Sequence, residues 1–473
     1  MSKIIKNTSL YTIGNILPQA VGFFLLPIYT HYLTPSDYGI VSSLQVLTSI
    51  LGIFFTLAID RSIYRMYFDH KTEAGKKDFL GTITIALFLI STIVLLLVFI
   101  FRSTVGLIYK SIEFYPYYTL AILAAFFSIF QIVPKIYYQV NEKADKFIII
   151  SIFQFLINVG FTLWFVIGKL EGALGMLKGA LVANIIIAPI VIYISFKSIN
   201  FRFKYNLFIE SLKFSIPMIP SLLSAFVLNL SDRIFIERYF TLTDVGIYSL
   251  GYKIAGLIGI LASSFLLAYN PIFFELANSD NQIVAKEKIA KYNQTFILIV
   301  ILISFLITFF SKEAIILLLD AKYKESYKIV PIIAFSYLTI QITGLFNMMI
   351  YQNKKSVVLM VIGLSSAGIC ILMNFILIPV YGAYGAAIST VISFFIVFIL
   401  SWKYAIKCYY VPIKWKEILS FFIPLTMVIV LFQYIFDMNI IISLSLKILL
   451  CVLGILIFYK RYYSEVIAIL KKS

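Results

Sequence analysis

Long unbroken apolar runs are the feature that most limits what this chain can fold into. One run covers residues 83–101 and another covers residues 296–310. Of the 473 residues, 61% are hydrophobic and 13% charged, against about 45–50% and about 25% in soluble domains. Such a chain would precipitate in water, and within lipid only helices and closed barrels satisfy their backbone hydrogen bonds. Barrel strands would alternate apolar and polar residues, so the unbroken runs predict an all-α polytopic membrane protein.

A length rule converts these runs into spans, because a helix needs about 20 apolar residues to cross about 30 Å of hydrocarbon. It predicts about fourteen transmembrane helices, near residues 8–32, 38–59, 79–101, 117–140, 147–168, 175–196, 212–238, 244–270, 292–310, 327–350, 356–379, 383–402, 418–436 and 440–459. The first and seventh are long for one crossing, so we expect them to be tilted or bent. Prolines in equivalent places of both spans favour hinges, although proline is common in membrane helices in general.

The chain also repeats itself. Residues 32–42 read Y-L-T-P-S-D-Y-G-I-V-S and residues 239–249 read Y-F-T-L-T-D-V-G-I-Y-S, with six of eleven positions matching at an offset of 207. Residues 172–175 (G-A-L-G) recur at 382–385 (G-A-Y-G), and Tyr138-Gln139 recurs as Tyr351-Gln352. Self-similarity at a nearly fixed offset indicates internal duplication.

The number of crossings between the two copies of the long motif sets the symmetry of the halves. Six predicted spans separate them, so both copies lie on the same side of the membrane and the halves are parallel repeats. We therefore predict an N-lobe (residues 1–200, helices 1–6), a C-lobe (residues 201–410, helices 7–12) and an added pair, helices 13–14, with a tail (residues 411–473). We expect the first helix to be a retained, uncleaved signal-anchor.

The net charge of +17 has two interpretations, a nucleic-acid partner or the excess of Lys and Arg in cytoplasmic loops. The basic residues are scattered in short loops between apolar runs, which favours the second interpretation and a cytoplasmic position for both termini. A basic loop around residues 312–328 is the exception on the opposite side. No nucleic-acid partner is expected.

Enzyme and metal signatures are absent from the sequence. Cys370, Cys408 and Cys451 show no pairing or metal-binding spacing, and His31 and His70 are the two histidines. No loop much exceeds 20 residues, so no catalytic domain fits outside the membrane. We predict a protein that is not an enzyme and that needs no cofactor and no metal.

Ionisable residues inside spans carry the functional signal, because an unpartnered charge at a helix centre costs about 2.5–3.5 kcal/mol on insertion scales. Lys253 lies well inside helix 8, and we expect it to face a cavity. Asp232 and Arg233 lie in helix 7, with Glu237 one turn further on. This helix-7 cluster is equally well explained as an interfacial ion pair that holds the turn into helix 8.

Other polar residues mark helix faces. Lys135 is aligned with Gln131 and Gln139 at four-residue spacing in helix 4, and Arg61 closes helix 2 beside Asp60. Amides share single faces in helix 1 (Asn15 and Gln19) and in helix 5 (Gln154 and Asn158). Such faces either bind neighbouring helices or line a path for sugars. Lys447 is interpreted as structural.

Several stretches resemble polysaccharide transporters of the O-antigen flippase (Wzx) type. They are Ser231-Asp232-Arg233 followed by residues 244–249 (D-V-G-I-Y-S), Asn374 with residues 378–379 and 382–387, and residues 15–38 with Thr34-Pro35. This group is part of the multidrug, oligosaccharidyl-lipid and polysaccharide exporter (MOP) superfamily. The resemblance implies two six-helix lobes around a V-shaped cavity, alternately open to each side. It also implies an undecaprenyl-pyrophosphate-linked oligosaccharide as substrate, turned over across the bacterial cytoplasmic membrane.

The residues suit that chemistry, because a pyrophosphate cannot cross hydrocarbon unaided. We predict that Lys253, Arg233 and Arg61 contact the anion, that Asn15, Gln19 and Lys135 contribute to substrate binding, and that Asp232 and Glu237 are candidates for coupling to a proton or sodium. Other membrane proteins of polysaccharide assembly are expected partners.

Two rival functions stay open. A drug/cation antiporter of the same superfamily would favour acidic over basic residues inside its lobes. A membrane enzyme such as an O-antigen polymerase would need a sizeable outer loop or an acidic catalytic motif near an interface.

Overall fold

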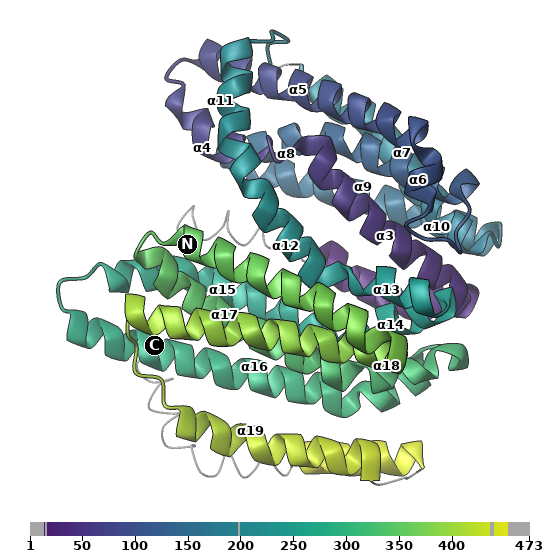
Figure 1. Ribbon diagram of the computed structural model, residues 1–473, viewed down its shortest axis with the longest axis vertical. Helices are drawn as coiled ribbons and strands as arrows, with labels where there is room; N and C mark the ends of the chain where they lie inside the picture. The colour runs from purple at the N-terminus through teal and green to yellow at the C-terminus, as the bar shows by residue number, and fades with distance from the viewer. Residues whose placement is uncertain (1–13, 15–16, 197–198, 436–438, 453–473) are drawn as a thin grey trace.

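The computed structural model describes residues 14, 17–196, 199–435 and 439–452. Within these ranges every regular element is a helix, as the sequence predicts. The elements form two groups that lie one above the other in Figure 1, α3 to α10 above and α14 to α18 below, with α19 outermost on the lower group.

The upper group follows the chain from α2 to α10. Its elements are α2 (Leu26–Tyr32), α3 (Pro35–Thr56), α4 (Arg61–Met66), α5 (Glu73–Ile100), α6 (Arg102–Gly106), α7 (Thr119–Ser128), α8 (Ile132–Val140), α9 (Ala144–Leu163) and α10 (Gly172–Ser195). Residues 17–24 are also helical.

The chain then crosses to the lower group. The helix α11 (Tyr205–Ser215) still lies beside α4 and α5 at the top of Figure 1, and α12 (Ile219–Leu230) runs down from it to α18. The remaining elements are α13 (Asp232–Tyr239), α14 (Leu242–Ala255), α15 (Leu257–Ala277), α16 (Gln282–Leu318), α17 (Val330–Gln352), α18 (Ser356–Cys408) and α19 (Trp415–Val430). A shorter apolar helix covers Ile440–Val452. The predicted boundaries at residues 200 and 410 remain predictions.

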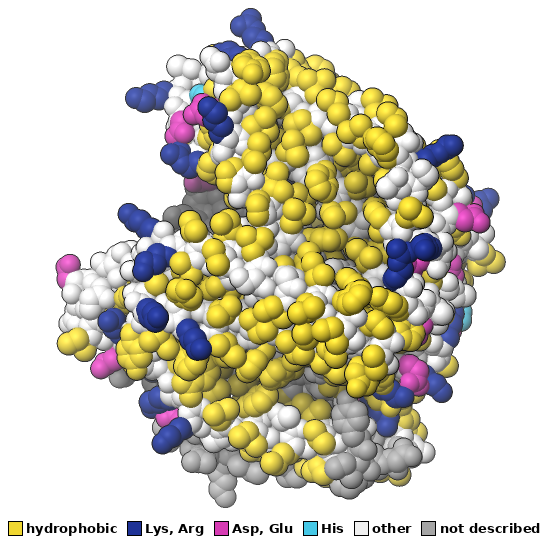
Figure 2. All heavy atoms as spheres, viewed as in Figure 1, with side chains coloured by type: hydrophobic (Ala, Val, Ile, Leu, Met, Phe, Trp, Pro, Cys, Tyr) yellow, Lys and Arg dark blue, Asp and Glu magenta, His cyan; other side chains and the backbone are white. Residues whose placement is uncertain are grey.

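Eleven of the described helical segments are long and apolar enough to cross a membrane. The longest, α18, doubles back at Gly382, where φ is +56°. Ser389 donates its hydroxyl to the carbonyl of Cys370 at 3.3 Å, so the two arms lie side by side. Counting the two arms of α18 separately gives twelve crossings. The first and last of the fourteen predicted spans, 8–32 and 440–459, lie partly outside the described residues and remain predictions. Hydrophobic side chains cover the middle of the face shown in Figure 2, and Lys and Arg lie mostly toward its edges.

The predicted bend of the seventh span is present. A short 3₁₀ turn at Ile216–Met218 separates α11 from α12, with Pro217 inside the turn and Pro220 directly after it. Proline supplies no backbone donor and clashes with the preceding helical turn, so the chain changes direction here. The equivalent prediction for the first span falls partly on residues outside the described ranges.

The G-A-x-G repeat has a conformational cause that the sequence reading, which assigned it to helix packing, did not foresee. Gly172 and Gly382 both have a φ of +56°, a region that side-chain-bearing residues rarely adopt. The second glycine of each copy fits tightly, because a Cβ on Gly385 would lie 2.3 Å from the carbonyl oxygen of Leu377 and one on Gly175 would lie 3.0 Å from the backbone of Phe165. The repeat therefore marks the same tight turn in both halves.

The helix Ile440–Val452 is fixed to α16 by a buried ion pair. Lys447 Nζ lies 2.9 Å from Glu313 Oε2 and also donates to the carbonyl of Phe309 at 2.6 Å. Ser443 donates to the other Glu313 oxygen at 2.7 Å. Lys447 is fully buried, so its role is to hold the hairpin in register.

Candidate functional site

A cavity of about 500 Å³ lies between α8 and α9, with Gly14 and Pro18 also in its lining. Its polar lining consists of Tyr64, Lys135, Gln139, Ser151, Gln154 and Asn158. The described lining residues include one cation, Lys135, and no carboxylate. A wall of amides and hydroxyls around a single positive charge suits an anionic, hydroxyl-rich ligand.

Lys135 is held in place by a chain of amides. Its Nζ donates to Gln154 Oε1 at 2.6 Å, and Gln154 Nε2 donates to Asn184 Oδ1 at 3.4 Å. Gln131 donates to the same Asn184 oxygen at 3.1 Å, and Asn184 Nδ2 donates to the carbonyl of Ala124 at 2.9 Å. The amides therefore link α8, α9, α10 and α7, and they fix the cation at the cavity wall.

A second cavity of about 550 Å³ shares Asn158 with the first and extends along α3, α7 and α10. Its polar lining is Gln45, Thr48, Ser49, Ser128, Asn158, Thr162 and Asn184. Of the residues that the structure describes, Tyr29 is the one ionisable side chain in this lining. The two cavities together form a continuous polar surface on the upper helix group.

Lys253 belongs to the lower helix group. It follows Gly246 by seven residues on α14, which is two helical turns, so both lie on one face of the helix. Gly246 touches α3, and Lys253 is exposed although Tyr252, Ile254 and Ala255 beside it are buried. This places Lys253 on the α3-facing side of α14, in agreement with a position between the two groups.

The two copies of the duplicated motif pack against each other. A Cβ on Gly39 would lie 1.9 Å from the carbonyl oxygen of Leu242, and a Cβ on Gly246 would lie 1.9 Å from that of Pro35. The repeat offset of 207 residues converts one contact into the other, because it relates Gly39 to Gly246 and Pro35 to Leu242. The contact is therefore reciprocal, like that of a twofold-symmetric dimer. We call this reciprocal contact of α3 and α14 the seal.

The rest of each motif starts the helix that carries its glycine. Thr34 accepts from the backbone of Asp37 while Asp37 accepts from the backbone of Thr34. Thr241 and Asp244 form the same reciprocal pair at the start of α14. These capping boxes fix where both helices begin, and so they set the register of the seal.

Loops from each half strengthen the seal. Tyr323, just after α16, shares its hydroxyl proton between the carbonyl oxygens of Leu33 at 3.1 Å and Thr34 at 2.8 Å. Burial raises the pKa of the Tyr323 phenol, which keeps it protonated as a donor. In the other direction, the backbone N–H of Ser111 donates to Glu237 Oε1 at 2.8 Å. Each loop joins the third and fourth crossings of its half, so the arrangement is again reciprocal.

Asp232 and Arg233 satisfy each other near the seal. Arg233 Nη1 lies 2.7 Å from Asp232 Oδ1 and donates to the carbonyl of Asn229 at 2.7 Å. The guanidinium stacks on the ring of Tyr252 at 4.2 Å from its centroid, and the Tyr248 hydroxyl donates to Asp232 Oδ2. Both charged side chains are buried. Arg233 therefore pairs with its neighbour Asp232 and not with Glu237, the carboxylate that lies one helical turn away.

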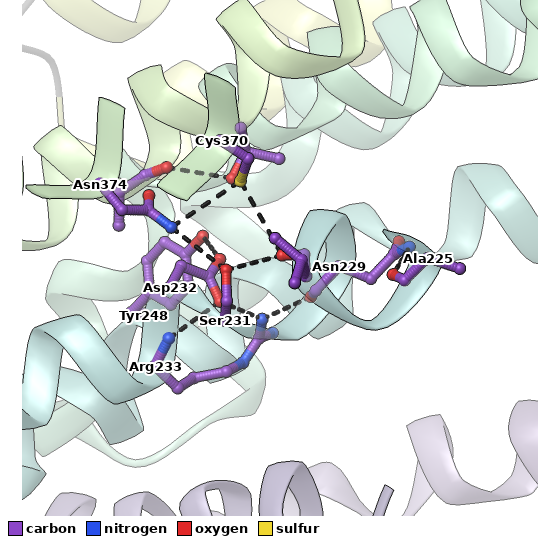
Figure 3. A network of polar contacts seen from close by, with 11 residues as sticks. Ala225, Asn229, Ser231, Asp232, Arg233, Tyr248, Cys370 and Asn374 are labelled. Carbon is purple, nitrogen blue, oxygen red and sulfur yellow. Dashed lines mark hydrogen bonds and ion pairs between the residues drawn. The ribbon is translucent and has the colours of Figure 1, made fainter. Parts of the chain in front are cut away.

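This pair is part of a larger polar network (Figure 3). Asn374 on α18 donates to Ser231 Oγ at 3.2 Å and to the sulfur of Cys370 at 3.7 Å. Ser231 in turn donates to the carbonyl of Val227 at 2.7 Å. The network ties α12 and α13 to α18 and holds the segment that leads into the seal.

The remaining predicted site residues are dispersed. Arg61 lies at the other end of α3, half exposed, with its Nε 3.5 Å from Asp60. Gln19 is exposed on the first helix, and Asn15 lies outside the described residues. Glu237 is buried, and its Oε2 has no hydrogen-bond partner within the described part of the chain. The structure brings Lys135 together with Gln139, Gln154 and Asn158, and it separates them from Arg233.

Two features of the site escaped the sequence reading. Asn184, which positions the whole amide chain, is a single amide in an apolar helix with no partner at helical spacing. The contact between the two copies of the duplicated motif is the second such feature. Its signal in the sequence is that both copies lie on one side of the membrane and share a glycine, Gly39 and Gly246.

Comparisons with known proteins extend this description. A sequence family described as "Polysaccharide biosynthesis protein" matches residues 4–277. The chain is 24% identical to Lsg locus putative protein 1 of Haemophilus influenzae over 75% of this chain and 87% of the relative. It is 25% identical to the capsular polysaccharide biosynthesis protein CapF of Staphylococcus aureus over 85% and 99%.

Solved structures share the fold. The lipid II flippase MurJ in an inward closed conformation aligns with a TM-score of 0.72 at 15% identity, over 96% of this chain and 99% of that one. An inward-facing multidrug resistance MATE transporter of the MOP superfamily aligns with a TM-score of 0.57 at 14% identity, over 87% and 95%. The MurJ alignment extends over nearly the full length of both chains.

Proposed function

Because this chain belongs to the polysaccharide biosynthesis protein family, we propose that it is a flippase that moves an undecaprenyl-pyrophosphate-linked oligosaccharide across the bacterial cytoplasmic membrane. The substrate is a repeat unit of O-antigen, capsule or exopolysaccharide. Both termini lie in the cytoplasm, and the sealed end faces outward.

One observation carries the proposal. A polar surface with Lys135 in its wall lies inside a membrane-embedded helix array whose other end is closed by the duplicated motif. A space closed at one end and lined for a charged, hydroxylated molecule is what alternating access requires. Opening the seal while the opposite end closes would release the glycan outside.

An apolar cavity offers a place for the lipid chain. It measures about 460 Å³ and lies between α3 and α12, lined by Leu47, Ile50, Phe226 and Ile234 with Arg238 among them. A polyprenyl tail beside this cavity would remain in contact with lipid while its headgroup enters the polar space. Lys253 and Arg61 are our candidates for contacting the pyrophosphate, with Gln19 and Asn15 beside the sugars.

Glu237 is a better candidate than Asp232 for binding the proton or sodium ion that drives the cycle. Both carboxylate oxygens of Asp232 accept hydrogen bonds, and Arg233 neutralises it. Glu237 has one oxygen without a partner and bridges to Ser111 of the other half. A carboxylate in that position changes its surroundings whenever the seal parts.

The drug/cation antiporter is less compatible with these residues, because the described part of the chain places no carboxylate in the lining of either polar cavity. An enzyme of polysaccharide assembly would need a catalytic acid–base pair in the site. The described polar lining consists of amides, hydroxyls and one lysine, which do not form such a pair.

The test is deletion of the gene and separate complementation. We expect undecaprenyl-pyrophosphate-linked repeat units to accumulate in the inner leaflet, with surface glycan lost and then restored by the intact gene. Purified protein in liposomes should also move such a lipid to the opposite leaflet. Unchanged surface glycan in the deletion strain would contradict the proposal.

A further inference from the structure

We propose that Lys135 and its amide chain form a binding subsite for an oxyanion carried by the transported molecule, so that this flippase selects an anionic group and does not merely tolerate one. The inference rests on the proposed function and names the chemistry that the site recognises. The oxyanion is either the diphosphate or an acidic group on a sugar, such as a uronic acid carboxylate.

The charge balance of the cavity is the first argument. Lys135 lies within the membrane span Phe114–Val140, and among the described residues it forms no ion pair. Among the described residues, the polar lining of both connected cavities lacks a carboxylate. A cation in the membrane without a counter-ion is unfavourable, and such residues usually face a substrate path.

The geometry of the ammonium group is the second argument. A lysine ammonium has three N–H donors, and the described residues supply one acceptor, Gln154 Oε1. Gln154 is itself fixed by Asn184, which is anchored to the backbone of Ala124. The remaining donors therefore point from a fixed position, and an oxyanion bound there would meet a preorganised partner.

The surroundings match a glycan beside the anion. Gln139, Asn158 and Ser151 supply donors and acceptors for hydroxyl groups, and Phe155 supplies an apolar ring face. Gln139 Oε1 already accepts from the Tyr64 hydroxyl, which directs its amide. A charged sugar or a diphosphate next to a sugar fits this lining, whereas a neutral lipid headgroup leaves the lysine unpaired.

A purely structural role makes a different prediction. If the Lys135–Gln154 bond only joins α8 to α9, then Gln154→Glu should strengthen the joint by creating an ion pair. If the subsite binds an oxyanion, the same change gives Lys135 an internal counter-ion of nearly identical shape and expels the ligand. Gln154→Glu thus separates the two roles without deleting any packing.

The experiment uses the full chain in nanodiscs and two synthetic lipids. Both are undecaprenyl-diphosphate disaccharides, one ending in glucuronate and the other in glucose. Binding of each is measured for the wild type and for Lys135→Gln, Lys135→Arg and Gln154→Glu, with thermal stability recorded for every variant. Lys146→Gln is the matched control, since this exposed lysine lies in the first turn of α9 and its substitution removes the same charge.

We expect Lys135→Gln and Gln154→Glu to weaken binding about tenfold or more, with Lys135→Arg and Lys146→Gln close to wild type. Loss confined to the glucuronate lipid identifies a sugar acid, and equal loss for both lipids identifies the diphosphate. Wild-type binding by Gln154→Glu, or by a folded Lys135→Gln, would overturn the inference. Separately, failure of the wild type to flip either lipid in liposomes would contradict the proposed function while leaving the binding result interpretable.

Discussion

The sealed end and the polar cavity of this protein handle polar groups in opposite ways. At the sealed end, Asp232, Arg233 and Tyr248 satisfy one another, and the seal is made by backbone contacts of Gly39 and Gly246. In the cavity, Lys135 keeps donors that no described side chain accepts. The polar groups of the sealed end bind one another, whereas the cavity leaves donors that a ligand can bind. A charged side chain within the membrane therefore indicates a ligand site where it lacks a counter-ion from the protein, as Lys135 does among the described residues, and not where it is paired, as Arg233 is.

The largest effect should come from breaking the self-satisfied region. Arg233→Met leaves Asp232 buried without a counter-ion, and we expect a loss of about 3–5 kcal/mol in the free energy of unfolding. Denaturant titration in detergent and the amount of protein in membranes would measure it. Arg61→Met is the control, because its half-exposed pair with Asp60 should contribute at most about 1 kcal/mol. Equal stabilities of the two variants would erase the distinction between the regions.

The seal can be weakened by a single methyl group. Gly39→Ala and Gly246→Ala each place a Cβ against a backbone oxygen that has no room to move, and we expect a cost of about 1–3 kcal/mol to the closed state. Labelling of an introduced Ser36→Cys thiol by a membrane-impermeant reagent should increase. Gly52→Ala on the same helix, where no atom lies within 4 Å, should leave the labelling unchanged. Labelling that stays at the wild-type level in all three variants would show that the contact does not close the protein.

The exposed cation Lys253 on α14, which lines neither polar cavity, should affect transport and not stability. Lys253→Ala is expected to reduce glycan export about tenfold, the effect of losing about 1.4 kcal/mol of interaction with the anion. Lys253→Arg keeps the charge and should retain most of the export. Protein levels should stay normal in both, because Lys253 is exposed. Full export by Lys253→Ala would remove this residue from the substrate path.

The smallest effect should come from the hydrogen bonds that Tyr323, in the loop after α16, donates to the segment before α3. Tyr323→Phe removes the hydroxyl shared by Leu33 and Thr34 and leaves the ring in place, so the closed state should lose about 1 kcal/mol. The Ser36→Cys labelling assay would detect a modest increase, below that of the glycine variants. An increase as large as theirs would assign the seal to the loop instead.

Much of this architecture follows from the sequence. The apolar runs predict the eleven membrane-length helices of the described residues, and Pro217 and Pro220 mark the bend before α12. The chain belongs to the polysaccharide biosynthesis protein family, as the resemblance implies, and it shares its fold with the lipid II flippase MurJ. Helical spacing also places Gln154 and Asn158 on one face, and both line the cavity.

The site could be predicted only where its contacts are local. Spacing suggests a partner for Arg233 on its own helix one turn away, but the residue directly before it, Asp232, takes that place because burial and the Tyr248 hydroxyl fix its carboxylate there. Asn184 reaches Gln131 and Gln154 across three helices, which no periodicity reveals. The contact between Gly39 and Leu242 joins residues about 200 positions apart and depends on the two halves closing on each other.

The central claim is that the two copies of the duplicated motif part during transport. Ser36 and Thr243 occupy equivalent positions in the two copies, one on each side of the seal. A Ser36→Cys/Thr243→Cys variant, with the three native cysteines changed to alanine, can be joined by a reducible bifunctional thiol reagent in liposomes. We predict that joined protein stops moving the lipid-linked oligosaccharide and that reduction restores the wild-type rate. Undiminished transport by the joined protein would contradict the account.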